Sequence, residues 1–484
     1  MNNPFRSMRY GIRANLRQVL LHLLQVLLVG MTLGMMRTVV PALAETEFGV
    51  PRGSFMLLVA FVVAFGFVKG AMNFVAGRMA ERLGRKRVLL LGWLVALPIP
   101  AIIYFANSWT WIVFATVLLG VNQGLTWSMT QTAKLDITRA DQRGLVIGLN
   151  EFSGYVGVAL AGIVTAYVAS LLGARLGLLW FGGVVVMLAT LLTWLAVVET
   201  LPWVQAQVKS QVKSPTDISA QPLIKISTGE MFALMSWRDK RMAALCQAGL
   251  VEKFVDALVW VFWPIYLQQQ GVSLQNMAWI VGVYGFTWGG AQLVTGKLSD
   301  RVGRHRLNYL GMWVCGTGVG LMPLGSGAAW WSTSAAITGL GMAMLYPNLS
   351  AAVADIAHPS WRASAIGIYR FWRDVGYGIG ALGLGAAAVW GGQIESAFWF
   401  VAVAMLASGA VLLVWGEETH PNILQFNNSQ TETIHGTIFG ITCHNKTCLW
   451  QSACRFSIRA KYQRADERCG ANEQSGDGGG RVLF

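Results

Sequence analysis

The stretch Gly77-Arg-Met-Ala-Glu-Arg-Leu-Gly-Arg-Lys-Arg87 lies between two long apolar segments and decides the fold. It recurs as Gly296-Lys-Leu-Ser-Asp-Arg-Val-Gly-Arg-His-Arg306, at an offset of 296 − 77 = 219 residues and with no gap inside the motif. Each copy is a short, densely charged stretch that joins two membrane-length segments. Such a stretch at matched places in two halves indicates a duplicated membrane protein.

Each copy of the motif combines two glycines, one carboxylate and several arginines. Glycine allows a tight turn and a close approach of backbones, and arginine is costly to move across a bilayer, so it holds the loop in the cytoplasm. The lone carboxylate can pair with a neighbouring helix terminus or arginine and so latch one conformation. The equivalent positions are Gly77 and Gly296, Glu81 and Asp300, Arg82 and Arg301, Gly84 and Gly303, Arg85 and Arg304, and Arg87 and Arg306.

The pattern Gly-x-x-x-Asp/Glu-Arg-x-Gly-Arg-Lys/Arg resembles the loop signature of the major facilitator superfamily. The resemblance implies an all-α polytopic membrane protein with twelve transmembrane helices, arranged as two six-helix pseudo-repeats with the site between them. Glu81 stands where the family usually has aspartate, which preserves the charge. The same offset also relates Gly120 to Gly339, Asp136 to Asp355, Arg143 to Arg362, Gly148 to Gly367, Phe152 to Phe371 and Gly157 to Gly376.

The composition independently indicates a membrane protein. Of the 484 residues, 54% are hydrophobic and only 12% are charged, with a mean hydropathy of +0.50, and soluble chains of this length are less apolar and richer in charge. The net charge of +14 arises from basic residues in loops expected on one side, with only Arg52 and Arg175 expected on the other. By the positive-inside rule we expect an integral plasma (inner) membrane protein with both termini in the cytoplasm, and no nucleic-acid partner.

Twelve apolar spans divide the chain into five parts. We expect a cytoplasmic N-terminal segment at 1–17, a six-helix bundle at 18–198, a cytoplasmic linker at 199–241, a second six-helix bundle at 242–416 and a disordered cytoplasmic tail at 417–484. The six cysteines are expected as free thiols, and their spacing in the tail fits no zinc site, so no metal and no cofactor are predicted. The expected spans are 18–43, 54–76, 88–106, 109–133, 144–171, 176–198, 242–267, 276–295, 307–324, 328–353, 363–390 and 395–416.

Nine ionisable residues lie inside these apolar spans. Each costs roughly 2.5–3.5 kcal/mol to insert, so each is a candidate for a functional role. Five are positive and four are negative, and this near balance predicts that many of them are paired. They are Arg37, Lys69, Lys253, Arg370, Arg373, Glu151, Glu252, Asp256 and Asp374.

The seventh span is the richest in charge. Glu252, Asp256 and Trp260 are spaced by four residues and share one helix face, and Lys253 can reach Asp256 at i, i+3. A carboxylate at this depth whose protonation changes as a partner leaves can couple solute movement to protons. We therefore predict proton coupling at Glu151, Glu252, Lys253 or Asp256, with a static lysine–aspartate pair between helices as the alternative.

Glu151 and Arg370 occupy equivalent repeat positions in the fifth and eleventh spans. In the family these helices belong to the set that rocks across the domain interface, so the resemblance implies ion pairs that close the inner gate. Helices 2 and 11 meet in that family, which makes Lys69 a partner for Asp374; permanent pairs within each half are the alternative. The expected gating residues are Lys69, Gly77, Glu81, Arg82, Gly84, Arg85, Gly296, Asp300, Arg301, Gly303, Arg304, Arg370, Arg373 and Asp374.

Helices 1, 4, 7 and 10 line the solute cavity in the family, and the resemblance assigns cavity residues accordingly. Arg37 offers a guanidinium to an anionic group of the solute, or it pairs with Asp256 or Glu252. The expected cavity residues are Arg37, Asn122, Gln123, Trp127, Trp260, Tyr346 and Asn348.

These features predict a secondary active transporter that moves a small organic solute by alternating access, coupled to protons, with export by antiport favoured. Two features found in the family are absent: Gly120 stands where proton-linked members often have arginine, and Gly154-Tyr155 stands where drug antiporters often have a Gly-Pro pair. A passive uniporter or an importer therefore stays open, as does a transporter-like solute sensor. We expect no enzyme, since the sequence has no nucleotide-binding loop and no nucleophile–base pair. The expected partners are a small-molecule substrate, protons and the lipid bilayer, and the expected state is a monomer.

Overall fold

The computed structural model describes residues 8–48, 55–211 and 227–424. These residues form helices joined by short connections, with no strand among them, and they belong to one compact unit that ends at Leu424. The predictions made for Arg52 and for the tail beyond residue 424 lie outside the described residues.

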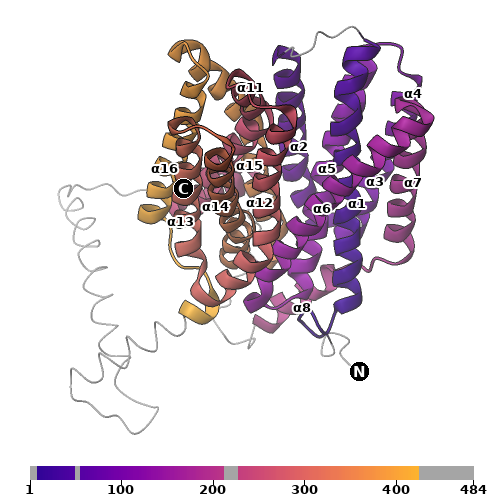
Figure 1. Ribbon diagram of the computed structural model, residues 1–484. Coiled ribbons are helices and arrows are strands. Elements are labelled where there is room, and N and C mark those ends of the chain that lie inside the picture. Colours follow the sequence, from indigo (N-terminus) through magenta and orange to yellow (C-terminus); the bar gives the residue numbers. More distant parts are fainter. Residues whose placement is uncertain (1–7, 49–54, 212–226, 425–484) are drawn as a thin grey trace, which may run out of the picture. The chain divides into compact units, whose positions relative to one another are not determined.

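Six membrane-length segments form the first half of the chain (Figure 1). The third segment is broken between Ala96 and Ile99, where Pro98 and Pro100 lack the backbone N–H that a continuous helix requires. The segments are α1 (Leu16–Thr46), α2 (Phe55–Leu83), α3 (Arg85–Ala96) with α4 (Ile99–Phe105), α5 (Trp109–Ile137), α6 (Arg143–Leu172) and α7 (Ala174–Leu195).

Six further segments form the second half (Figure 1). The seventh is interrupted by the π-helical turn η4, which lies between Asp256 and Pro264, where proline removes one donor from the helical ladder. The segments are α10 (Lys240–Ala257) with η4 (Leu258–Phe262) and α11 (Trp263–Gln269), α12 (Leu274–Val302), α13 (Arg304–Leu321), α14 (Ala328–Ile356), α15 (Arg362–Gly391) and α16 (Glu395–Trp415).

Short helices connect the segments. Between the halves, α9 begins with a capping box in which Ser227 and Glu230 each bond the other's backbone N–H, and these bonds hold the pKa of Glu230 below its ordinary value. The short elements are α8 (Leu201–Gln211), α9 (Thr228–Ala233), η2 (Ala140–Gln142), η3 (Leu234–Arg238), η5 (Met322–Leu324) and η6 (Pro359–Trp361).

The twelve segments each overlap one of the twelve predicted spans, which confirms the predicted all-α class. Seven helical stretches of the described residues are long and apolar enough, taken alone, to cross a membrane. Helices α10 and α15 are not among them, and they carry six of the charged side chains noted above. These helices depend on their neighbours to compensate charge inside the membrane.

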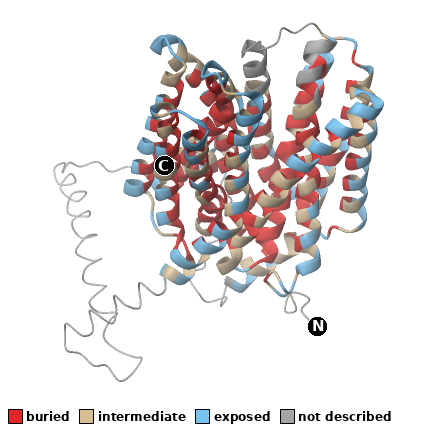
Figure 2. Ribbon diagram, in the orientation of Figure 1, coloured by how far each residue is buried: buried red, intermediate tan, exposed pale blue. Residues whose placement is uncertain are grey.

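Each half buries its own apolar core, with exposed residues on the outer helix faces (Figure 2). One core contains Trp93 and Leu119, and the other contains Trp263, Leu345 and Phe398. The two halves meet where α2 packs on α15 and where α6 packs on α12. These two contacts are related by the repeat and enclose the buried charges.

The motif is largely helical, which corrects the expectation of a loop: α2 continues through it to Leu83. A side chain at Gly77 would meet the Ala363 carbonyl oxygen of α15 at 2.6 Å, so this glycine permits close helix packing. Gly84 has a φ of 93° and makes the turn into α3. Gly296 and Gly303 repeat these two roles in the second half.

Candidate functional site

Eight charged side chains gather in the middle of the bundle, four positive and four negative, and each is at most 6% exposed. We call them the central charge cluster. They come from α2, α6, α10 and α15, so both halves contribute to one buried site. The members are Lys69, Lys253, Arg370, Arg373, Glu151, Glu252, Asp256 and Asp374.

Arg373 lies at the centre of this cluster. Its Nε is 2.7 Å from Oε1 of Glu252, and its Nη2 is 3.9 Å from Oε2 of Glu151. The guanidinium also stacks over the ring of Tyr346, 4.0 Å from the centroid. Glu151 lies in the first half of the chain and Glu252 in the second, so Arg373 bridges the halves.

Glu151 is held by donors from both halves. The indole Nε1 of Trp127 donates to Oε1 at 3.0 Å, and Nδ2 of Asn150 donates to the same atom at 3.1 Å. Arg370 lies 3.7 Å from that oxygen and donates a hydrogen bond to Gln131. The predicted Glu151–Arg370 contact is therefore present across the halves, and its role in gating stays a prediction.

Four hydrogen-bond donors surround the Asp256 carboxylate. Lys253 Nζ is 2.7 Å from Oδ2, and the hydroxyl groups of Tyr346 and Tyr377 donate to that atom at 2.7 Å and 3.0 Å. The hydroxyl of Tyr284 donates to Oδ1 at 3.3 Å. Neither Tyr284 nor Tyr377 was among the candidates from sequence. Their helices, α12 and α15, lie outside the set that lines the cavity in the family, and no spacing links them to Asp256.

Lys69 and Asp374 form the expected pair between α2 and α15, at 3.5 Å. Asn73, one turn after Lys69, donates to Asp374 at 2.6 Å and accepts from Ser128 at 2.5 Å. Lys69 also lies over the ring of Trp127, 5.3 Å from the centroid. Asn73 was missed because a neutral amide within an apolar span gives no charge signal.

Aromatic side chains pack together where α6 meets α12, next to the central charge cluster. Tyr155 of α6 packs on Trp288 of α12 with ring centroids 4.1 Å apart, and Trp288 packs on Tyr346 at 4.8 Å. With the 219-residue offset, Tyr155 is equivalent to Asp374 and Trp288 to Lys69. One contact between the halves is thus ionic, and its counterpart is aromatic.

Three predicted cavity residues donate hydrogen bonds to neighbouring backbone, while their amide oxygens have no partner among the described residues, and their role in binding solute stays a prediction. Asn122 donates to the Gly92 carbonyl at 2.9 Å, and Asn348 donates to the carbonyl one turn before it, at 2.5 Å. Gln123 donates to the Val29 carbonyl at 2.9 Å, so it ties α5 to α1.

Arg37 makes neither of the ion pairs considered for it. It stacks over the ring of Trp260, 5.2 Å from the centroid, and lies within 4.0 Å of no carboxylate in the described part of the chain. Trp260 is 43% exposed, and Asp256 pairs with Lys253. Among the described residues, Arg37 therefore has no carboxylate partner.

At the end of the bundle that carries the charged motifs, here called the motif end, the two halves cap each other. Glu81 of α2 accepts the backbone N–H of Ser364, in the first turn of α15, at 3.1 Å. Asp300 of α12 accepts the N–H groups of Gly144 and Leu145, in the first turn of α6, at 3.0 Å and 2.9 Å. A carboxylate at a helix N-terminus satisfies donors that the helix leaves open and complements its dipole.

The motif arginines differ in their contacts. Arg85 is 2.7 Å from Asp136 within the first half. Arg304 is 2.7 Å from Asp300 and 3.1 Å from Asp355, which also lies 2.6 Å from Arg143 of the first half. The side chains of Arg82 and Arg301 are exposed.

Two glutamates missed by the sequence analysis complete the motif end. Glu199 accepts the N–H groups of Arg85 and Lys86 at 2.9 Å and 3.0 Å, and Glu418 accepts those of Arg304 and His305 at 2.9 Å and 3.2 Å. They are 418 − 199 = 219 residues apart, so the repeat offset would have found them. Each caps the helix that follows a motif.

Phe232 of α9, which lies in the linker, packs against the motif end. Its ring centroid is 5.7 Å from that of Phe74 on α2, and 5.6 Å and 5.8 Å from those of Phe371 and Trp372 on α15. The indole of Trp372 donates to the Ser236 hydroxyl at 2.9 Å. The linker therefore packs against both halves where they meet.

Comparison with known proteins agrees with this architecture. A family model described as Major Facilitator Superfamily matches residues 23–251 and 245–455. In the part of the chain that the structure describes, no group of three or more histidine, cysteine, aspartate or glutamate side chains is placed to hold a metal.

Among curated proteins, the chain is similar to an uncharacterised MFS-type transporter of Salmonella typhimurium, 22% identical over 66% of this chain and 78% of the relative. It is 23% identical to a probable 4-methylmuconolactone transporter of Cupriavidus pinatubonensis, over 77% of this chain and 82% of the relative. It is 26% identical to the 3-(3-hydroxy-phenyl)propionate transporter of Escherichia coli, over 43% and 47% of the two chains.

Two solved structures share the fold. One is the human organic anion transporter MFSD10, with a TM-score of 0.66 and 15% identity, covering 85% of this chain and 100% of the other. The second is the proton:xylose symporter XylE, with a TM-score of 0.65 and 14% identity, covering 85% and 97%.

Proposed function

The chain belongs to the major facilitator superfamily, and from this premise we propose that it carries small organic carboxylates across the membrane together with protons. Membership makes it an integral membrane transporter of small solutes and not an enzyme. The proposal concerns the finer points, which are the solute class, the coupling ion and the direction.

The charge balance of the central cluster supports proton-coupled movement of an anion. Four cations face four carboxylates in a buried site, so an added anion leaves a net negative charge unless a proton enters with it. Two of the cations are arginines, which keep their protons at any physiological pH. An anionic solute accompanied by one proton preserves neutrality, whereas a cationic solute would require one of the two lysines to lose its proton.

We assign the anion site to Arg373 and the proton site to Glu252. The solute carboxylate takes the place of the Glu252 carboxylate at the guanidinium of Arg373, which Glu252 contacts at 2.7 Å. The displaced glutamate takes the proton on a carboxylate oxygen, and its Oε2 has no hydrogen-bond donor among the described residues. Glu151, on the other side of Arg373, holds the guanidinium in place.

Asp256 is better suited to anchor the site than to carry the proton. Three tyrosine hydroxyls and Lys253 converge on it. Protonation would put a hydrogen on a carboxylate that already accepts from all four groups, and a buried donor left without its acceptor costs about 1–3 kcal/mol.

The relatives bear on the solute, and the charge balance of the cluster bears on the direction. Two of them are named for 4-methylmuconolactone and for 3-(3-hydroxy-phenyl)propionate, both small organic solutes with a carboxyl or lactone group. These names state no direction. Because the charge balance of the cluster favours a proton that moves together with the anion, we propose uptake by symport in place of the export by antiport that the sequence alone favoured.

We further propose that the motif end faces the cytoplasm of a cell whose inner membrane holds a monomer. The basic residues of the motifs and of the linker support this orientation by the positive-inside rule. The capping contacts then close the cytoplasmic side and leave the opposite side to receive solute. The two bundles at 18–198 and 242–416 would move as the two halves of the carrier.

Transport in proteoliposomes tests the proposal. The vesicles hold a trapped pH dye, and labelled 3-(3-hydroxyphenyl)propionate is added outside with an inward proton gradient. We expect concentrative uptake, acidification of the lumen and loss of accumulation when a protonophore is added. Solute uptake without a pH change would leave a uniporter, luminal alkalinisation would indicate antiport, and binding without flux would indicate a sensor.

The variant Glu252→Gln separates coupling from binding. It mimics the protonated glutamate, so we expect exchange of labelled for unlabelled solute to continue while proton-driven accumulation is lost. Asp141→Asn is the matched control, because it makes the same change at a partly exposed carboxylate that pairs with Arg139. Accumulation by Glu252→Gln at the wild-type level would overturn the assignment of the proton site.

A further inference from the structure

We propose that Trp288 and Gln292 on α12 form a subsite that binds a hydroxyl or carbonyl group on the aromatic part of the solute. The inference rests on the proposed function and specifies its solute further. The ligand class is an aromatic carboxylate that carries a second oxygen group on its ring.

Both side chains have hydrogen-bonding groups that nothing in the described part of the chain satisfies. Gln292 is fully buried, and neither its Nε2 nor its Oε1 has a partner. Trp288 is 3% exposed, and its indole Nε1 has no acceptor. An unsatisfied buried amide or indole N–H costs about 1–3 kcal/mol for each group left open. Each such group in a native structure calls for an explanation, and a bound solute that supplies the missing partner is one.

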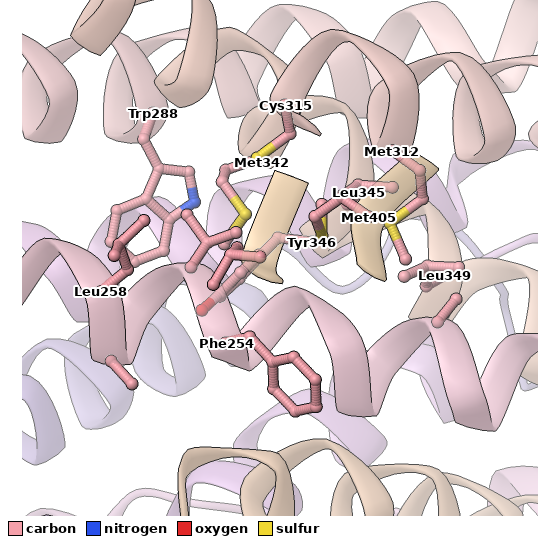
Figure 3. Packing of buried hydrophobic residues seen from close by; sticks show 14 of the residues in the cluster. Phe254, Leu258, Trp288, Met312, Cys315, Met342, Leu345, Tyr346, Leu349 and Met405 are labelled. Carbon is pink, nitrogen blue, oxygen red and sulfur yellow. The ribbon is translucent and has the colours of Figure 1, made fainter. Parts of the chain in front are cut away.

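Trp288 lies beside the proposed anion site. Gln292 is one helical turn further along α12, so the two residues share a face. Trp288 packs on Tyr346 at 4.8 Å, and Tyr346 lies under the guanidinium of Arg373 at 4.0 Å and donates to Asp256. Figure 3 shows Trp288 and Tyr346 in one layer of side chains, next to Met342 and Leu258.

The backbone around Gln292 places it between two helices that border the site. A side chain at Gly148 of α6 would meet the Gln292 carbonyl oxygen at 2.6 Å. Three residues further along α12, the Thr295 hydroxyl donates to the Ala343 carbonyl of α14 at 2.5 Å. Gln292 is thus held between α6 and α14, the helices that carry Tyr155 and Tyr346.

The repeat supplies an internal comparison. The positions on α2 equivalent to Trp288 and Gln292 are Lys69 and Asn73. Those side chains are satisfied, since Lys69 lies 3.5 Å from Asp374 and Asn73 bonds both Asp374 and Ser128. On α2, these two positions take part in a network whose members bond one another. On α12, the equivalent positions carry hydrogen-bond donors and an acceptor without partners among the described residues.

The chemistry of the open groups defines what they can bind. The indole only donates, whereas the amide of Gln292 donates and accepts. A ring hydroxyl can accept from the indole and donate to Oε1 of Gln292, and a carbonyl can accept from Nε2. The rings of Tyr155, Trp288 and Tyr346 offer faces and edges to the aromatic part of such a solute. A site built to hydrogen-bond a hydroxyl discriminates strongly against the analogue that lacks it.

The test compares two acids that differ by one hydroxyl, 3-(3-hydroxyphenyl)propionate and 3-phenylpropionate. Their dissociation constants are measured by calorimetry on the full chain in lipid nanodiscs, so the result does not depend on transport or coupling. We expect the wild type to bind the hydroxylated acid at least about 10-fold more tightly. In Gln292→Met, which keeps the side-chain volume, we expect this ratio to fall to within about 2-fold of one.

Two further variants separate recognition from packing. Trp288→Phe keeps an aromatic ring without the N–H and is expected to reduce the same ratio. Gln247→Met makes the same change in α10, where the amide bonds the carbonyls of Ala244 and Ser408, and is expected to leave the ratio unchanged. A purely structural role of Gln292 would weaken both acids equally.

The outcomes separate this inference from the proposed function. A wild type without preference between the acids, or a Gln292→Met that keeps the preference, overturns the subsite. Tight and selective binding without proton-driven uptake would overturn the carrier proposal and leave the subsite in place. Failure of the wild type to bind either acid would overturn both the subsite and the proposed solute class.

Discussion

Tyr155 and Trp288 pack with their ring centroids 4.1 Å apart at the two positions where the other half of the repeat places Asp374 and Lys69. The contact between α6 and α12 is thus aromatic, and the contact between α2 and α15 is ionic. The repeat conserves the place of each contact between the halves and changes its chemistry. A solute bound between them, as proposed, would meet cations on one side and rings on the other.

We expect the stability effects of mutating Lys69 and Asp374 to be coupled. Asp374→Asn leaves Lys69 buried without its carboxylate, and breaking a buried pair in this way costs about 3–5 kcal/mol. Lys69→Met in the same chain removes the stranded cation, so the double variant should be more stable than Asp374→Asn alone. Thermal unfolding in detergent of both single variants and the double variant measures the coupling, and strictly additive effects would contradict a direct pair.

The capping contact of Asp300 is expected to hold the motif end closed. Asp300→Ala leaves the N–H groups of Gly144 and Leu145 without their acceptor, at about 1–3 kcal/mol. The population should shift toward an open motif end. Spin labels on cysteines at Arg139 and Arg301, both exposed, report this as a longer distance between the halves.

The control for the capping prediction is Arg82→Ala, at an exposed position of the first motif. It removes a motif charge without touching a cap, and the label distance should stay as in the wild type. An unchanged distance in Asp300→Ala would mean that the cap contributes little to closure.

We expect Phe232, in the linker helix α9, to stabilise the closed motif end as well. Phe232→Ala removes the ring that contacts Phe74 and Phe371, on helices from opposite halves. Truncation of a packed phenylalanine costs about 3–5 kcal/mol when the ring is fully buried and less here, since the site is only partly buried. The label distance should increase, while Phe286→Ala, the same change at a residue 84% exposed on α12, should leave it unchanged.

The two helix caps found through the repeat are expected to be equivalent in strength. Glu199→Gln and Glu418→Gln weaken the charged caps of α3 and α13, and each should lower stability by about 0.5–2 kcal/mol. Glu417→Gln is the matched control, because Glu417 is 68% exposed and pairs with Arg241 at 3.5 Å without capping a helix in the described part of the chain. Thermal unfolding measures all three, and a control as damaging as the caps would refute the capping role.

The sequence could predict the contacts that spacing or repeat symmetry determines. The Lys253–Asp256 pair follows from an i, i+3 spacing on one helix, and it is present at 2.7 Å. The Lys69–Asp374 pair could be predicted because helices 2 and 11 meet in the family that the sequence resembles. The offset of the repeat also relates Glu199 to Glu418, which follow the sixth and the twelfth spans.

The remainder depends on packing in three dimensions. The tyrosines around Asp256 come from α12, α14 and α15, and no spacing along the chain brings Tyr284, Tyr346 and Tyr377 to one carboxylate. Whether Gln292 has a partner is likewise a property of the assembled helices. The sequence shows that a polar residue lies in an apolar span, but it does not show whether that residue has a hydrogen-bond partner in the folded protein.

The mutual capping at the motif end gives it the reciprocity of an isologous interface. Glu81 of the first half caps α15 of the second, and Asp300 of the second caps α6 of the first. Under the proposed alternating access, separation of the halves at this end would break both caps, so we expect the two caps to open together. Concerted opening would limit partly open states, through which ions would leak and dissipate the membrane's gradients.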